Sequence, residues 1–322
     1  MIKAQKLQKW TYFALGATVL VLFVLPPVLP AYIVILLTQS LIFCIVAMSL
    51  DLLVGYTNLG SLGHAAYFAI GAYTTAILVT RYHVGFAGCL LSSIGVAAGG
   101  AALLGLLALK AAGVYFLLIT LAIAMTLWGL IYRWTSMTGG ENGIGGIPRP
   151  DLGLSLNLVN PVYFYFFILF CFIICSIFIF LLVRSPFGRT LMGIRDSESR
   201  MKVLGFNVWL HKYLAYIIAG AFAGVGGNLY AYYNSFVSPN NASLSQCLEI
   251  VLMVSMGGPG TMIGANLGSF IITFLKNLVS VYTKRWMMIL AVVYVLSALY
   301  APEGILGLLK QFQRQRLKAA QP

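Results

Sequence analysis

Long apolar runs alternate along the whole chain with short segments that are polar, charged, or rich in glycine and proline. An α-helix needs about 20 apolar residues to cross the hydrocarbon core of a bilayer, and by that measure the chain has about ten candidate spans. The least regular parts are 60–80 and 246–282, where glycine, proline and polar residues interrupt the run. The predicted spans are 11–29, 31–54, 60–80, 84–108, 111–132, 161–183, 213–234, 246–264, 265–282 and 286–305.

The composition places this chain outside the soluble proteins. Hydrophobic residues make up 61% of its 322 residues and charged residues only 8%, whereas a soluble domain carries roughly 25% charged residues. No soluble fold of this length could hide so much apolar surface, so lipid must be the solvent for most of it. The predicted fold class is therefore all-α: a polytopic transmembrane helix bundle that occupies 1–322 as a single transmembrane domain.

The net charge of +13 comes from lysines and arginines gathered in short segments beside apolar runs. This pattern is a topology signal, because cytoplasmic loops are enriched in Lys and Arg, and it argues against nucleic acid as a partner. We place both termini in the cytoplasm, with a basic tail at 306–322, together with the loop 184–212. The segments 133–160 and 235–245 carry no net charge and are placed outside.

No motif of a known enzyme class is present. The glycine-rich segment 257–261 lacks the lysine with which a phosphate-binding loop reaches a phosphate. The three histidines lie far apart, and the five cysteines sit in or beside apolar runs, where small buried hydrophobic residues are the better interpretation. We predict no catalytic residue, no metal site and no cofactor in this chain, so we do not expect an enzyme; a membrane enzyme or scaffold stays open as an alternative.

Ionisable residues inside a membrane are costly and often functional. Asp51 and Lys110 fall near the predicted cytoplasmic ends of their spans, where their side chains are expected to reach water. Glu249 falls near the outer end of its span, and Lys276 follows in the next one. The sequence suggests no acid–base pair at mid-membrane, so a proton- or sodium-coupled carrier has only modest support.

The stretch 55–73 alternates glycines with polar residues. Irregular backbone within a membrane is tolerated only against protein or a watery cavity. The stretch therefore either lines a solute path or is a glycine-rich helix in a tight bundle. A second glycine-rich segment, 138–148, is either a binding surface or gate on the outside or an ordinary loop. The candidate path residues in the first stretch are Asn58, Ser61, His64 and Tyr67.

The loop 184–212 has the features of a docking element. Ser185 and Pro186 form a helix-start signal, and Gly205 is expected to end a short helix. Apolar positions between them mix with four cations and two acids, and the whole loop carries six cations. We predict a short amphipathic cytoplasmic helix that presents a face to a soluble partner, the alternative being a solvated, positively charged loop.

Several motifs in this order resemble the permease subunits of branched-chain amino acid ABC importers, the LivM-like family. The resemblance runs over about 31–309. It rests on the stretch 55–73, the loop Thr138–Pro148, the run Ser185–Gly205, the segment Glu249–Gly264 and the closing Ala301–Ile305. Related transporters also move urea, short amides and other small metabolites, and a carrier or channel that works alone stays open as an alternative.

The resemblance implies a bacterial inner-membrane importer of type II architecture, with inverted halves. The chain would pair with a second, similar permease subunit. Two cytoplasmic ATPase subunits would hold ATP and Mg, and an extracytoplasmic binding protein would deliver the amino acid. Glu249 would join the path residues. The family's coupling helix maps onto about 185–205, with Gly188, Arg189, Arg195, Glu198 and Gly205 as candidate elements.

This chain departs from the general importer pattern in the coupling loop. That pattern has Glu-Ala-Ala, three further residues and then glycine. Aligned on Gly205, the present chain begins instead with Ser199-Arg200-Met201. The departure leaves the docking residues themselves open.

Overall fold

The computed structural model describes residue 23, residues 26–151, 158–283 and 285–300, and residues 304, 305 and 307. These residues are mostly helical, which confirms the predicted all-α class. The longer helices are α2 (Ala31–Thr57), α3 (His64–Tyr82), α4 (Phe86–Ala108), α5 (Val114–Arg133), α7 (Pro161–Arg184), α8 (Pro186–Asp196), α10 (Val208–Asn234), α11 (Leu244–Gly257), α12 (Met262–Tyr282) and α13 (Trp286–Tyr300).

Short elements connect these helices. They are η1 (Pro26–Val28), α6 (Thr135–Thr138), η2 (Gly140–Asn142), β1 (Ile144–Gly145), α9 (Glu198–Val203), β2 (Phe236–Val237) and η3 (Pro239–Ala242). Strands β1 and β2 pair antiparallel, with Ile144 opposite Val237. This pairing joins two connections that are far apart in sequence.

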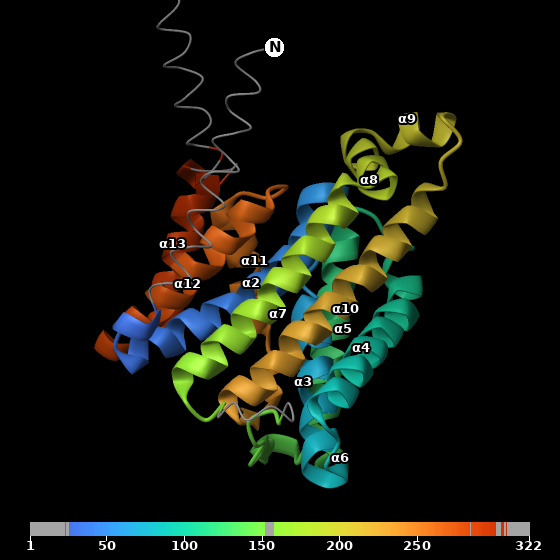
Figure 1. The fold of residues 1–322 in the computed structure, drawn as a ribbon. Coiled ribbons are helices and arrows are strands. Elements are labelled where there is room, and N and C mark those ends of the chain that lie inside the picture. Colours follow the sequence, from blue (N-terminus) through green and yellow to red (C-terminus); the bar gives the residue numbers. More distant parts are fainter. Residues whose placement is uncertain are drawn as a thin grey trace, which may run out of the picture.

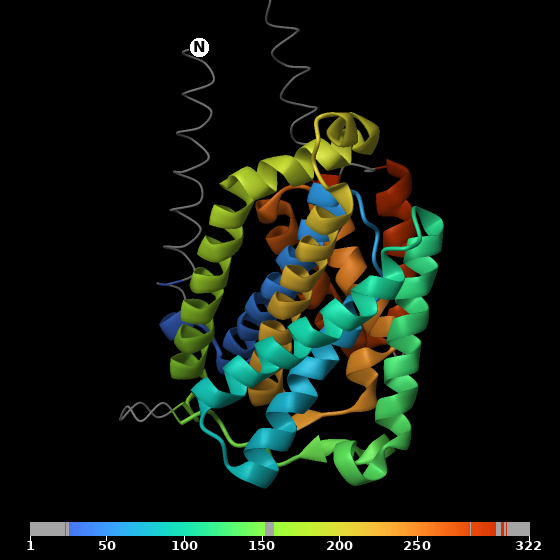
Figure 2. The same ribbon diagram turned by 90° about the vertical axis from the view of Figure 1, so that its right-hand side faces the viewer.

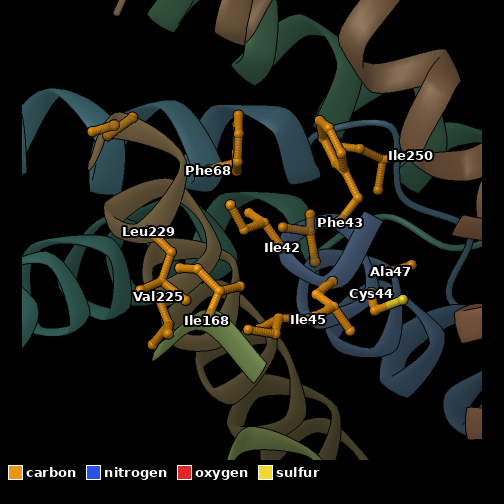
Figure 3. Packing of buried hydrophobic residues seen from close by; sticks show 14 of the residues in the cluster. Ile42, Phe43, Cys44, Ile45, Ala47, Phe68, Ile168, Val225, Leu229 and Ile250 are labelled. Carbon is orange, nitrogen blue, oxygen red and sulfur yellow. The ribbon is translucent and has the colours of Figure 1, made fainter. Parts of the chain in front are cut away.

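Helix α2 forms the centre of the bundle. It contacts α7, α10, α11 and α12, and most of its residues are buried. A helix that is apolar on every side must be covered on every side, which accounts for its lack of a polar face. Figure 3 shows how Ile42, Phe43 and Ile45 of α2 meet Phe68 of α3, Ile168 of α7, Val225 and Leu229 of α10, and Ile250 of α11.

Small residues let α10 lie close to α3 and α4. A Cβ atom added at Gly71 would fall 2.2 Å from the carbonyl oxygen of Gly224, and one at Gly227 would fall 2.0 Å from that of Phe68. Such contacts are typical of helix pairs in membranes. Two glycines of α4 differ: Gly95 and Gly99 face open space, so these two do not mediate packing inside this chain.

Six described helices are long and apolar enough to cross a bilayer: α2, α4, α5, α7, α10 and α12. The predicted span 11–29 lies almost wholly outside the described residues. The predicted span 246–264 is wrong, because α11 ends at Gly257 and α12 begins at Met262. At about 1.5 Å per residue, the 14 residues of α11 extend only about 21 Å, less than the hydrocarbon core of about 30 Å.

The bundle has two distinct ends. In Figure 1, α8 and α9 lie at one end and α6 at the other, while α7 and α10 run between them. The quarter-turn view in Figure 2 shows the same separation. The connections predicted to lie on opposite sides of the membrane therefore do lie at opposite ends of the molecule.

Candidate functional site

The connection between α7 and α10 folds into two helices. The Ser185 side chain caps α8 by accepting a hydrogen bond from the backbone N–H of Gly188, and Pro186 takes the first helical position. At Ser197 the backbone turns extended, and this serine caps α9 through the N–H of Arg200. The prediction of a single short helix is therefore wrong: α8 and α9 form a bent pair with a break at Ser197.

The predicted coupling residues occupy different positions on this pair. Gly188 is buried, and a side chain there would meet the carbonyl oxygen of Val183 at 2.2 Å. Arg189 is exposed. Glu198 forms an ion pair with Lys212 at the start of α10. Gly205 follows α9 with a φ of +86°, a conformation that glycine adopts without strain.

An apolar surface is exposed where α9 leads into α10. It consists of Val203, Leu204 and Phe206, of which Val203 is 88% exposed. This segment directly follows α9, at the end of the bundle that carries α8 and α9 (Figure 1). Apolar residues exposed to water beside cationic ones are typical of a protein-binding surface. We call this set the α9 patch.

Arg195 faces a different way from the α9 patch. One terminal nitrogen, Nη1, donates to the backbone oxygen of Gly55 on α2 at 2.8 Å. Its Nε lies 3.3 Å from the carboxylate of Asp196, a neighbour on the same helix. Arg195 thus links α8 to the interior of its own chain.

The predicted path residues do not share one environment. Asn58 is exposed and ends α2 in a left-handed conformation. Ser61, His64 and Tyr67 are buried. The His64 Nε2 lies 2.7 Å from the Ser49 hydroxyl. The Tyr67 hydroxyl donates to that of Tyr216 at 2.9 Å. The structure thus describes these three residues in contact with their own chain, and their part in a solute path stays a prediction.

An ion pair between the buried Glu249 and the partly exposed Lys276 joins α11 to α12. Both carboxylate oxygens of Glu249 accept hydrogen bonds from Lys276 Nζ, at 3.0 and 2.8 Å. Glu249 is 4% exposed. The ammonium also lies 5.0 Å from the ring centroid of Trp286 on α13, within cation–π range. The sequence, which suggested no acid–base pair at mid-membrane, did not predict this contact between α11 and α12.

The close approach of the two helices accounts for this pair. Gly257 lies against Gly264, and Gly268 against Met253, so α11 and α12 form an antiparallel hairpin. One further turn along each helix brings position 272 opposite Glu249. Helical side chains tilt toward their own N-terminus, and that tilt carries the long Lys276 side chain back by one turn to the carboxylate.

Asp51 also differs from its expected environment. It is fully buried instead of reaching water. Its Oδ1 accepts a hydrogen bond from the backbone N–H of Gly260 at 2.7 Å. Lys110, by contrast, is exposed as expected. Sequence reasoning missed Asp51 because its partner is a backbone group more than 200 residues away.

The opposite end of the bundle is ordered by backbone contacts. Arg81 Nη2 donates to the carbonyl oxygens of Ser136 and Met137. Arg149 Nη1 donates to the carbonyl oxygen of Tyr232 at 2.7 Å, and burial lowers the pKa of its guanidinium. A hollow of about 430 Å³ lies between the α3–α4 turn and residues 148–151. The segment 138–148 thus contains regular structure and is more than a flexible loop.

Comparison with known proteins identifies the family. A family model described as "Branched-chain amino acid transport system / permease component" matches residues 32–299. The chain belongs to this permease family. The resemblance read from the motifs is thereby confirmed, and this member of the family is a membrane transport component.

Individual relatives agree with the family model. The chain is 30% identical to the high-affinity branched-chain amino acid transport system permease protein LivM of Escherichia coli over 291 residues, which cover 84% of this chain and 68% of that protein. It is 29% identical to LivM of Salmonella typhimurium over 306 residues, covering 88% and 72%. It is 26% identical to a probable LivH permease of Methanocaldococcus jannaschii over 287 residues, covering 83% and 89%. No solved structure matches this chain significantly.

Within the described residues, no group of three or more His, Cys, Asp or Glu side chains comes close enough to hold a metal ion. Two features stand out for function: the α8–α9 pair with the α9 patch, and the α11–α12 hairpin with its buried charges.

Proposed function

We propose that this chain is the membrane permease subunit of an ATP-binding cassette importer for branched-chain or related hydrophobic amino acids. The observation that carries the proposal is the family match over residues 32–299. The names of the LivM relatives, which cover most of the chain, supply the substrate class. The subunit has no ATPase site of its own, and separate subunits drive transport.

The proposed complex contains a second permease subunit. Support comes from similarity to both a LivM and a LivH protein, since one fold can then supply both halves of a pathway. Two cytoplasmic subunits bind ATP and Mg and dock on the α8–α9 pair. An extracytoplasmic binding protein delivers the amino acid at the end that carries α6, β1 and β2.

The proposed topology has both termini, the basic tail 306–322 and the coupling loop 184–212 in the cytoplasm of a bacterial cell, with the chain as one domain in the inner membrane. Six cations between Arg184 and Lys212 support this orientation. About ten spans with inverted halves would follow from the type II architecture, with 11–29 as the first crossing by its apolar length. The tail itself lies outside the described residues.

The proposed docking surface is the α9 patch, with Gly188, Arg189, Glu198 and Gly205 shaping or flanking it. Replacing Leu204 with Asp adds a charge to this apolar surface, so association with the ATPase subunits should weaken at least about tenfold, as for a charge buried in an interface. The matched control Leu204→Met keeps the apolar surface. Pull-down of the ATPase subunits checks both, and equal binding by the two variants would remove the patch from the interface.

The proposed pathway runs beside Asn58, Ser61, His64, Tyr67 and Glu249, which reach it when the bundle changes conformation. Neutral polar groups suffice for a zwitterion if the binding protein supplies selectivity. Alanine variants at the first four positions should lower uptake without blocking assembly. Unchanged uptake in all four would leave them a purely packing role.

The test of the proposed function is affinity purification of the tagged chain from its native host under mild solubilisation. A second permease and ATP-binding subunits should co-purify. A chain that emerges alone and conducts solute without ATP would favour a stand-alone carrier or channel. A complete complex whose binding protein takes urea or a short amide would retain the importer and change its substrate.

A further inference from the structure

Three parts of the chain that are distant in sequence meet beneath α8. They are the last turns of α2, the turn between α11 and α12, and the last turn of α8. Arg195 of α8 donates to the carbonyl oxygen of Gly55 at 2.8 Å. On the same side of α2, Asp51 accepts from the backbone N–H of Gly260 at 2.7 Å. One short segment of α2 therefore holds both α8 and the α11–α12 turn.

The backbone segments at this junction pack closely against each other. A Cβ atom at Gly55 would fall 2.0 Å from the backbone nitrogen of Gly260, and one at Gly260 would fall 3.1 Å from Arg195 Nη1. Gly258 and Gly260 have φ values of +110° and +79°. The turn is thus seated directly on α2, with the guanidinium of Arg195 at its edge.

The negative charge of a buried carboxylate accounts for the inward direction of the Arg195 side chain. Asp51 is fully buried, and its Oδ2 has no hydrogen-bond partner among the described residues. A carboxylate left uncompensated in a buried position is strongly unfavourable. Arg195 Nη1 donates to the backbone oxygen of Gly55, one helical turn from Asp51, and so brings a positive charge to this side of α2. Since α8 carries that cation, α8 is attracted to this one place on α2.

The turn connects this junction to the ion pair of Glu249 and Lys276. The helices α11 and α12 contact each other closely through Gly257, Gly264 and Gly268, so the hairpin is expected to move as one body. Glu249 and Lys276 lie farther along the same hairpin. A displacement of the turn would therefore shift the charged pair as well.

We propose that Arg195 and Asp51 form a tether that transmits the movement of α8 to the α11–α12 hairpin. Arg195 is then a positioning residue within the permease and does not itself contact the ATPase. This inference rests on the proposed function, because it assigns a mechanical role inside an ATP-driven transporter. It goes beyond that function by naming the internal route from the docking end to the hairpin.

The experiment uses the full complex in lipid nanodiscs or proteoliposomes and compares Arg195→Ala, Asp51→Asn and the double variant. Asparagine keeps an oxygen for the Gly260 N–H and removes the charge. Arg195→Ala alone leaves a buried unpaired carboxylate, so recovery of assembled complex should fall at least about tenfold. Adding Asp51→Asn should restore most of the assembly, because no unpaired charge remains.

Uptake per ATP hydrolysed separates positioning from a merely structural role. In the reassembled double variant this ratio should stay about tenfold below the unmodified complex, within the usual range of coupling between sites, because α8 is no longer tethered. Asp196→Asn is the matched control. It removes only the outward ion pair of Arg195, and both assembly and the ratio should stay unchanged.

Three results would overturn the tether. Asp51→Asn could fail to restore assembly in the Arg195→Ala background. The double variant could transport with a normal ratio, which would reduce Arg195 to charge compensation. Arg195→Ala could lose only the ATPase subunits, with or without Asp51→Asn, which would make it a docking contact. A failure of the proposed function is distinguishable, because the unmodified complex would then show no ATP-driven uptake, while the assembly measurements would still test the pair.

Discussion

The bundle buries polar groups in two contrasting ways. Along α2, α3 and α10 they are neutral and paired with each other, as in the contacts Ser49–His64 and Tyr67–Tyr216. Around the α11–α12 hairpin they are ionisable: Glu249 bonds to Lys276, and Asp51 accepts from the Gly260 N–H one helical turn from the Gly55 oxygen to which Arg195 donates. Burying a full charge costs far more than burying a hydroxyl, so the charged arrangement requires a reason beyond packing.

The contrast divides the molecule into a frame, which consists of α2, α3 and α10, and a moving part, which is the α11–α12 hairpin. Neutral bonds and glycine contacts fix α3 and α10 on α2. The Glu249–Lys276 pair lies within the hairpin, whereas Asp51 and Arg195 hold the hairpin's turn and α8 on α2. The contacts of Asp51 and Arg195 therefore report on the position of the turn, which the neutral contacts do not.

The largest expected effect comes from Lys276→Met. It leaves Glu249 buried without its cation, and removing one partner of a buried pair typically costs about 3–5 kcal/mol. The midpoint of thermal unfolding of the purified permease in detergent measures the loss. Adding Glu249→Gln should recover most of it.

The matched control for this pair is Lys202→Met, which removes a cation from the exposed surface of α9. Its effect should stay within about 0.5 kcal/mol. Equal midpoints for Lys276→Met and Lys202→Met would show that the Glu249 carboxylate is not energetically isolated, and the contrast between charged and neutral regions would be lost.

The next effect concerns the neutral frame. Gly227→Ala forces a Cβ atom against the carbonyl oxygen of Phe68, and such overpacking costs about 1–3 kcal/mol. Gly99→Ala is its control, because Gly99 faces open space. Denaturation of each variant in mixed micelles compares them. A loss at Gly99 as large as that at Gly227 would contradict the packing of α10 on α3.

The smallest effect should come from Tyr216→Phe. It removes one neutral hydrogen bond between helices, and such bonds average about 0.6 kcal/mol in membrane proteins. Tyr82→Phe, at an exposed ring, is the control. Thermal unfolding checks both, and a loss at Tyr216 that rivals Lys276→Met would mean that neutral contacts matter as much as charged ones.

The membrane fold class could be predicted from sequence because the constraint is overwhelming: so apolar a chain must be helical in lipid. The boundary between α11 and α12 was predicted at the wrong place. The stretch 246–282 was divided into 246–264 and 265–282, whereas the turn between the two helices lies at Gly257–Thr261. A better signal was available at α8 and α9, where Ser197 followed by Glu198 is a helix-start pattern in the middle of the loop.

The candidate residues fall into two groups: those whose role follows from their own residue type, and those whose role depends on contacts with distant parts of the chain. Gly205 could be predicted from its own residue type, because glycine commonly ends a helix, whereas Gly188 was named only through the family resemblance. Arg195 was selected with them, yet its inward direction depends on Gly55 and Asp51, 140 or more residues away. The roles of polar residues such as Ser61 and Tyr67 are equally hard to predict from sequence. A side chain that lines a path and one that bonds to a neighbouring helix have the same sequence signature.

The most direct test of the central claim is uptake of labelled leucine into proteoliposomes that contain the purified complex and its binding protein. The account predicts uptake that requires ATP hydrolysis and stops with a non-hydrolysable analogue. Leucine uptake of equal rate without ATP, by this chain alone, would contradict it and make the protein a stand-alone carrier or channel.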